Sequence, residues 1–305
     1  MAIPLFSAAE GTYRGNLHGH STHSDGLNSP ADVVRLYRDA GYDFTCLSEH
    51  YWSNPRFCAA TLNDASALDR DDFITLLSAE LHCHGKLYDR DGLWHIVANG
   101  LPPGFAMAGE TETGPELVSR AVAAGAYVTI AHPEWYSLTD AEAQALAEAG
   151  AHGVEIYNHA SAIDAARGGG TATVDYLLHQ GFPIHITATD DSHDIPRDAF
   201  GGWVMVAARE LTSGAILAAL KAGDFYASTG PDILSITRDG TVIEIETSPV
   251  QRIILAADKH HAEPVAGDGI TRARFDLKKF DPAFVRIAAI DARGRSAWSN
   301  PYWLG

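Results

Sequence analysis

The chain has 305 residues, of which 46% are hydrophobic and 20% charged, so it is long enough for one large domain and a small one. Its formal net charge of −17 argues against binding to duplex nucleic acid, because an acidic surface repels the phosphate backbone. No apolar run approaches the roughly 20 residues that a bilayer span requires, and the N-terminus lacks the pattern of a secretory signal. We therefore expect a cytoplasmic protein without a membrane partner, and the oligomeric state stays open.

The acidic residues are not spread evenly. From Gly230 onward ten basic and ten acidic residues cancel, so the acidic excess lies in the first part of the chain, together with thirteen of the fifteen histidines. The three cysteines, Cys46, Cys58 and Cys83, have no paired spacing and indicate reduced thiols. Cys83 lies between two histidines, so it is either a metal ligand or a buried spectator.

One local pattern occurs five times: an alanine-rich amphipathic stretch ends in glycine, and a β-type run follows. The five segments are YRDAG-YDFTCL, AVAAG-AYVTIA, LAEAG-AHGVEI, LLHQG-FPIHIT and AALKAG-DFYAST. Glycine just past a helix end takes the left-handed conformation without penalty, and the short apolar runs are typical of buried strands. Helix starts are indicated at residues 29–30, 114–115 and 139–140. This alternation predicts an α/β fold with a parallel sheet that is closed, or nearly closed, into a barrel.

The pattern changes after Gly230. The run ILSITRDGTVIEIETS contains two strands joined by an Asp-Gly turn, which is a strong hairpin signal. QRIILAA, RARFDL, FVRIAAID and RSAWSNPYWL are further short strands with no helix between them. We expect a small antiparallel β-sandwich domain over residues 230–305, after a barrel domain over residues 1–229.

Side chains that can bind metals follow the predicted strands of the first domain. His18 and His20 follow the strand YRGNL, and such an i, i+2 pair directs both imidazoles to one face, which suits one ion. The others stand at strand ends or in turns: Asp25, His50, Glu80, His95, His132, Asp191 and His193. Each alone could be a core histidine, a turn former or a capping carboxylate. Nine of them at equivalent strand ends instead indicate a metal site at the mouth of a barrel.

The run LHGHSTHSDG, followed by LSEH, AE, HIVANG, IAHP, VEIYN and TDDSH, resembles the polymerase-and-histidinol-phosphatase (PHP) domain family of the amidohydrolase superfamily, over residues 13–229. With its trailing STGP segment and β-domain, the chain is similar to the carbaryl-hydrolase-like branch. The resemblance implies a distorted (β/α)7 TIM-like barrel that holds two or three divalent metal ions. The family usually has aspartate where this chain has Glu49, so the role of that acidic residue is in doubt.

The resemblance also implies how the ligands are shared. His18, His20 and Asp191 would hold one ion; Glu80 would bridge it to a second, completed by His95 and His132; Asp25, His50 and His193 would form a third site. His82 and His84 lie near His95 in the sequence, and either is an alternative to it. Mixed histidine and carboxylate ligands suit zinc, manganese or iron, without choosing among them.

The expected activity is that of a metal-dependent phosphoesterase acting on small phosphate or nucleotide esters through a metal-bridging hydroxide. Glu80, Asp191 and His193 would be the catalytic residues. No glycine-framed serine nucleophile occurs, so covalent catalysis is not supported.

Substrate contacts are predicted for Arg197, Arg167 and Asn158, which stand on the correct side of the barrel. Each arginine is equally explained by a surface salt bridge, and Asn158 by the orientation of a metal ligand. Two alternative functions stay open. Aromatic residues at 51–52 and 135–136 would suit a carboxylic or carbamate ester hydrolase if they line the pocket, and a non-catalytic PHP module is the third hypothesis, with lost ligands as its signature.

Overall fold

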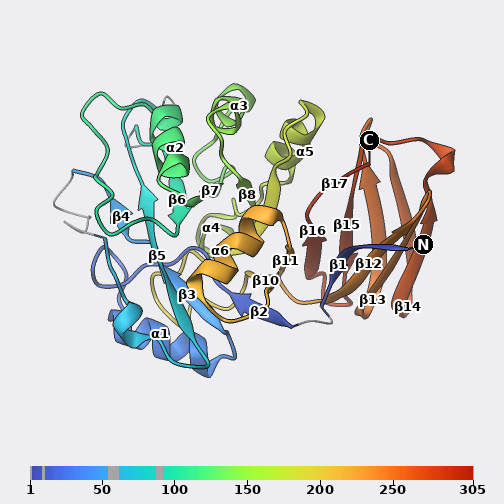
Figure 1. Cartoon of the computed structure of the whole chain (residues 1–305), viewed down its shortest axis with the longest axis horizontal. Coiled ribbons are helices and arrows are strands. Elements are labelled where there is room, and N and C mark those ends of the chain that lie inside the picture. Colours follow the sequence, from blue (N-terminus) through green and yellow to red (C-terminus); the bar gives the residue numbers. More distant parts are fainter. Residues whose placement is uncertain (1, 9–10, 54–61, 87–91, 305) are drawn as a thin grey trace.

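The chain folds into a mixed α/β part and an antiparallel β part that lie side by side (Figure 1). The structure is a computed structural model that describes residues 2–8, 11–53, 62–86 and 92–304. Cys58 lies outside the described residues, whereas Cys46 and Cys83 are free and buried. Within the described ranges, no helix combines the length and apolar character needed to cross a bilayer.

The α/β part contains strands β2 to β11 and helices α1 to α6. The strands are β2 (Thr12–Gly15), β3 (Phe44–Leu47), β4 (His50–Tyr51), β5 (Ile74–Leu81), β6 (Ile96–Asn99), β7 (Tyr127–Ile130), β8 (Gly153–Asn158), β9 (His185–Thr189), β10 (Trp203–Ala207) and β11 (Phe225–Ser228). The helices are α1 (Pro30–Asp39), α2 (Gly114–Ala123), α3 (Asp140–Glu148), α4 (His159–Ala165), α5 (Thr171–His179) and α6 (Ser213–Ala222), with a short 3-10 turn η1 (Ser66–Leu68).

The predicted helix boundaries agree with the structure. Ser29, Thr113 and Thr139 cap α1, α2 and α3, and each side chain accepts a hydrogen bond from a main-chain N–H of the first turn. The glycines that end the five repeated segments all have positive φ, as a left-handed helix stop requires. Helices α2, α3 and α5 lie next to one another along one side of the sheet (Figure 1).

The strands of the α/β part pair in a succession that returns on itself. The pairs β2–β3, β3–β5, β7–β8 and β8–β9 are parallel. A parallel bridge between Gly19 and Ser192 then joins the segments that follow β2 and β9. The arrangement is barrel-like, and the stricter (β/α)7 barrel stays a prediction.

The expectation of a parallel sheet fails at β6. This strand runs antiparallel to both β5 and β7, and no described residue between β5 and β6 is helical. A strand that returns without a crossover helix must run in the opposite direction. As a result, the N-terminal end of β6 lies at the same edge as the C-terminal ends of its neighbours.

The last repeated segment also differs from the expectation. Its strand β11 pairs antiparallel with β10 and with a strand of the β part, β16 (Ser296–Ser299). Strand β10 in turn pairs antiparallel with β2. Strands β10 and β11 therefore join the two parts of the sheet.

The β part is antiparallel, as predicted, and has its own core. Its other strands are β1 (Ile3–Ser7), β12 (Ile233–Asp239), β13 (Val242–Ala257), β14 (Ala262–Asp276), β15 (Phe284–Ile290) and β17 (Tyr302–Trp303), with a 3-10 turn η2 (Leu277–Lys279). Residues 3–7, which the expected boundary assigns to the first domain, pair with β12 instead. The long strand β13 pairs with β12, β14 and β15, and buried isoleucines such as Ile236, Ile245 and Ile253 fill the interior. Each such side chain contributes about 1.5–3 kcal/mol of burial free energy.

Candidate metal centre

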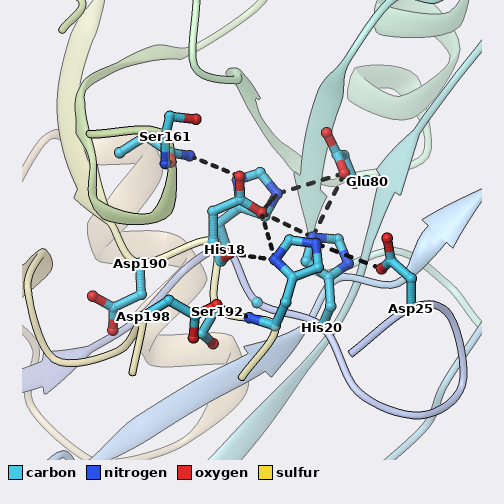
Figure 2. Close-up of polar contacts among 12 residues, drawn as sticks. His18, His20, Asp25, Glu80, Ser161, Asp190, Ser192 and Asp198 are labelled. Carbon is cyan, nitrogen blue, oxygen red and sulfur yellow. Dashed lines mark hydrogen bonds and ion pairs between the residues drawn. The ribbon is translucent and has the colours of Figure 1, made fainter. Parts of the chain in front are cut away.

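His18 and His20, which follow β2, direct their Nε2 atoms at one carboxylate oxygen. The Nε2 atoms lie 3.1 Å and 3.0 Å from Oδ1 of Asp191, just past β9. Oε2 of Glu80, near the end of β5, lies 3.6 Å from both. Figure 2 shows the imidazoles of His18 and His20 close to Glu80, with Asp25 on the side of His20. The pair thus faces one side, as its spacing predicts, and meets ligands from two other strands.

A second group is centred on the other oxygen of Glu80. Oε1 lies 2.8 Å from Nδ1 of His95 and 3.2 Å from Nε2 of His132. His95 immediately precedes β6, so the antiparallel direction of that strand is what brings it to the C-terminal ends of β5 and β7. Glu80 therefore lies between two sets of histidines, as a bridging ligand would.

The third group surrounds Asp25. Oδ2 of this residue lies 3.3 Å from Nε2 of His50, and Oδ1 lies 3.5 Å from Nε2 of His193. The ring of His20 stacks with the rings of both histidines, at centroid distances of 4.4 and 4.3 Å. This group is less buried than the other two and opens toward the cavity described below.

The structure thus brings all nine predicted ligands into overlapping groups whose potential ligand atoms lie within 4.8 Å of one another. Two atoms at the centre, Nε2 of His18 and Oε2 of Glu80, are buried without a hydrogen-bond partner among the described residues. Buried polar atoms are normally satisfied, and divalent ions would satisfy these. The imidazole and carboxylate donors fit zinc, manganese or iron, although the ligand assignment itself stays a prediction.

The charges of the site also suit cations. Burial alone would raise the pKa of Glu80, Asp191 and Asp25. At Glu80, the charges on His82 and His50 lower the pKa by more than burial raises it. At Asp191, the charges on His18 and His193 have this effect. At Asp25, a hydrogen bond and the charge from His50 have it. The pKa of each carboxyl is therefore below its usual range, and all three carboxylates are ionised at neutral pH, as metal binding requires.

The two alternatives to His95 have different environments. His84 is exposed and belongs to none of the groups. His82 is buried, with Nε2 2.8 Å from Nδ1 of His50 and Nδ1 2.9 Å from the carbonyl oxygen of Trp94. It adds to the cluster without displacing His95 from Glu80. Cys83 joins no group among the described residues.

Sequence reasoning missed Glu155, a fully buried residue in the middle of β8. Its Oε1 lies 2.7 Å from Nδ1 of His18 and accepts a hydrogen bond from Thr189 Oγ1 at 2.8 Å. Its Oε2 accepts from the main-chain N–H of His132 at 2.7 Å. Metal-bound histidines commonly donate their second N–H to a carboxylate. A charged residue inside the apolar run VEIYN was the available signal.

Asn158 ends β8 and also supports the cluster. Its amide donates to Glu155 at 2.9 Å and to Oδ2 of Asp191 at 3.2 Å, while its oxygen accepts from the main-chain N–H of Ser161 at 2.9 Å. These contacts favour the alternative that Asn158 orients a metal ligand over the prediction that it binds substrate.

Glu49, the position that departs from the family pattern, is 2% exposed and fully hydrogen-bonded. Its carboxylate accepts from the hydroxyls of Ser21 and Ser24 and from the amide of Asn63. Ser21 and Ser24 flank the turn that leads from His20 to Asp25. Glu49 therefore holds the position of that turn, and the longer side chain retains a supporting role.

Asp191 has an unusual backbone conformation. Its φ of 55° lies in the left-handed region that residues other than glycine rarely adopt. Its main-chain N–H donates to the carbonyl oxygen of His18 at 2.9 Å, and that of His20 donates to Ser192 at 2.8 Å. Such conformations concentrate at functional sites, where surrounding contacts hold them.

The three groups form the floor of a cavity of about 380 Å³. Trp52, Leu93, Trp135 and Asp164 are among the residues that complete its wall. The two indoles lie against histidines that are predicted ligands: the ring centroid of Trp52 lies 6.2 Å from that of His50, and that of Trp135 lies 5.1 Å from that of His132. Among the described residues, no lysine or arginine lines this cavity.

The arginines predicted to bind substrate lie elsewhere. Arg197 is half-exposed and paired with Asp164, Asp194 and Asp198 at 2.8, 3.2 and 3.3 Å. Arg167 is exposed. Neither side chain lines the cavity as it stands, so a role in substrate binding stays a prediction. The residues predicted to be catalytic, Glu80, Asp191 and His193, all line it.

Neither a family model nor a curated protein matches this chain. Among solved structures, the chain is similar to a two-domain protein of Bacteroides vulgatus that is described as containing a predicted PHP-like metal-dependent phosphoesterase. The two chains are 18% identical, the match covers 96% of this chain and 95% of the other, and the TM-score is 0.55. An amidohydrolase of Chromobacterium violaceum, solved with sulfate and no metal, has 16% identity, coverage of 61% and 89%, and a TM-score of 0.44. At 18% identity, the first likeness shows a shared fold along almost the whole chain.

Proposed function

We propose that this chain is a metal-dependent hydrolase of the PHP type, built on a (β/α)7-like barrel, that cleaves a phosphate ester of a small molecule. The observation that carries the proposal is the convergence of three carboxylates and six histidines at one cavity, which the three carboxylates and four of the histidines line directly. Two or three ions of zinc, manganese or iron would be held by these side chains. When bound, such ions activate water for attack and stabilise the charge on the ester oxygens.

The charge of the site favours an anionic ester. Asp25, Glu80, Asp191 and Glu155 carry four negative charges, and with three divalent ions bound the site would also carry six positive ones. The excess would attract a phosphate dianion even though no described arginine or lysine lines the cavity. The protein itself positions the donors: Glu155 orients His18, and Asn158 orients Asp191.

The wall of the cavity supports a second candidate, hydrolysis of a carboxylic or carbamate ester. Trp52, Leu93 and Trp135 offer apolar and aromatic surface beside the ligand histidines, and an uncharged ester needs no cationic side chain. The third hypothesis, a non-catalytic module, is disfavoured because no ligand position is lost and all nine side chains converge.

The test combines elemental analysis with a panel of aryl phosphate, phosphodiester, carboxylate ester and carbamate substrates. We expect two or three metal equivalents per chain and turnover of the phosphorus substrates. His18→Ala and Asp191→Ala should both lose metal and turnover, whereas His84→Ala, an exposed control outside the cluster, should retain them. Turnover of the carbonyl esters alone would establish the second candidate, and unchanged metal content in both ligand variants would refute the ligand assignment.

A further inference from the structure

A second cavity, of about 770 Å³, lies where the α/β part meets the β part. Arg14 of β2, Trp203 of β10 and Tyr157 of β8 line it from one side. Arg293 and Arg295, in the turn between β15 and β16, line it from the other. In Figure 1 this junction is the region where β2, β10 and β11 approach β16. The volume is within the range of small-molecule sites.

The charge of this cavity is opposite to that of the chain. Its wall contains three arginines and one carboxylate, Asp232, whereas the chain has 22 basic and 39 acidic residues. The cavity over the metal cluster has no lysine or arginine among its described lining residues. A concave basic surface on so acidic a protein concentrates positive potential where an anion can enter.

Arg14 is held in place without its charge being neutralised. Its guanidinium carbon lies 3.8 Å from the ring centroid of Trp203 and 4.1 Å from that of Tyr42. One terminal nitrogen donates to the hydroxyl of Tyr42 at 3.2 Å, but Nε is buried without a partner among the described residues. The nearby carboxylate of Asp43 accepts from the main-chain N–H of Arg14 at 2.6 Å. A guanidinium that is stacked on two rings and has no carboxylate partner among the described residues is preorganised to attract an oxyanion in the cavity.

The two arginines of the opposite turn differ from each other. Arg295 is paired with Asp291 at 2.7 Å, which fixes its side chain over Gly230. No described carboxylate pairs with the side chain of Arg293, which is exposed. An anion between Arg14 and Arg293 would thus contact both parts of the fold.

We propose that this cavity is a binding site for a small carboxylate or phosphate anion, separate from the metal centre. The site also adjoins the segments that support Asp191. Phe200 and Gly201 line the cavity, and their main-chain N–H groups both donate to Asp190 at 2.8 Å. His159, also in the wall, directly follows Asn158. Ala160 and Ser161, the next two residues, line the cavity over the metal cluster, so the two cavities approach each other at the start of α4.

The test uses the full, metal-loaded chain and the arginine reagent phenylglyoxal, with modified residues identified by mass spectrometry. Inorganic phosphate and succinate are the two probes. At about ten times the dissociation constant, a bound anion should slow modification of Arg293 and Arg14 by about tenfold. Arg272, an exposed arginine paired with Glu246 on the β part, is the internal control and should react equally with and without the anion.

Protection by phosphate alone would identify a phosphate ligand, and protection by succinate alone would identify a carboxylate ligand. Protection by both would identify a general anion site.

A second measurement tests whether the anion protects these arginines directly. Calorimetric titration should show the same binding step weakened about tenfold or more in Arg293→Ala and in Arg14→Met, since each loses charge-assisted hydrogen bonds. Arg272→Ala should leave that step unchanged. Equal modification with and without both anions, or unchanged binding in both cavity variants, would refute the proposal.

Discussion

Nδ1 of His18 lies 2.7 Å from Oε1 of Glu155, and both side chains are fully buried. Donation of this N–H to the carboxylate fixes the tautomer that leaves Nε2 free to bind an ion. Glu155→Gln should therefore lower metal affinity by about 10- to 100-fold while the fold is retained. Competition titration against a chelator measures this loss.

The matched control is Glu148→Gln, the same change at an exposed position on α3. It should leave metal affinity unaltered. Equal affinity in Glu155→Gln and the parent protein would show that His18 does not depend on this contact.

Metal binding should release protons. Burial lowers the pKa of both His18 and His50. The negative charges of Asp191 and Glu155 raise the pKa of His18 by more than burial lowers it, and Glu80 and Asp25 have the same effect on His50. Both pKa values therefore lie well above 6.5. Without ions, these imidazoles hold protons at neutral pH, and an ion must displace them. Affinity should then fall by about tenfold per pH unit for each displaced proton as the pH is lowered.

Titration calorimetry in two buffers of different ionisation enthalpy measures the number of protons released. We expect at least one per chain near neutral pH. Identical heats in the two buffers, together with an affinity that does not depend on pH, would contradict the prediction.

The positions of most of the predicted ligands could be found from the sequence because they follow short apolar runs that are recognisable locally. His50, His132 and Asp191 all stand at the ends of such runs, and the structure brings them together. The helix caps and glycine stops are local signals as well, and they were also correct. Strands that are buried on both faces and chain reversal at defined residues are sufficient to reveal this much of the fold.

What could not be predicted depends on contacts between distant residues. Glu155 and His18 are separated by 137 positions, so no local pattern indicates their hydrogen bond. The direction of β6 depends on how the chain returns from β5, and β1, at the N-terminus, pairs with β12, more than 220 residues later. Neither has a signature in the residues themselves, because strand order is set by packing of the whole sheet.

His95 and His82 compete for the same region, with ring centroids 4.5 Å apart. Nδ1 of His95 lies 2.8 Å from Oε1 of Glu80, whereas Nε2 of His82 lies 3.5 Å from Oε2 of Glu80 and 2.8 Å from Nδ1 of His50. His95→Ala should therefore lose about one metal equivalent, as expected for removal of a zinc-type ligand, and His82→Gln should retain full stoichiometry with weaker binding. Elemental analysis decides between them: loss of an equivalent in His82→Gln but not in His95→Ala would make His82 the ligand.

The side chain of Tyr37 contacts residues that flank the predicted ligands His18 and Asp191. Its buried hydroxyl donates to Oδ2 of Asp190 at 2.8 Å, accepts from the amide of Asn16 at 3.0 Å and lies 3.0 Å from Oγ of Ser192. Tyr37→Phe would leave these polar groups incompletely satisfied. We expect the free energy of unfolding to fall by about 1–3 kcal/mol, measured by chemical denaturation.

Tyr13→Phe, at a partly buried position on β2, is the control, since among the described residues its hydroxyl takes no part in this network. Because Asp190 also accepts three main-chain N–H groups from residues 200–202, it stays anchored in the Tyr37 variant, and metal stoichiometry should persist. Loss of a metal equivalent from the folded Tyr37 variant would mean that Tyr37 positions Asp191 through its neighbours. An equal free energy of unfolding in the two variants would mean that the Tyr37 hydroxyl contributes nothing to the stability of the fold.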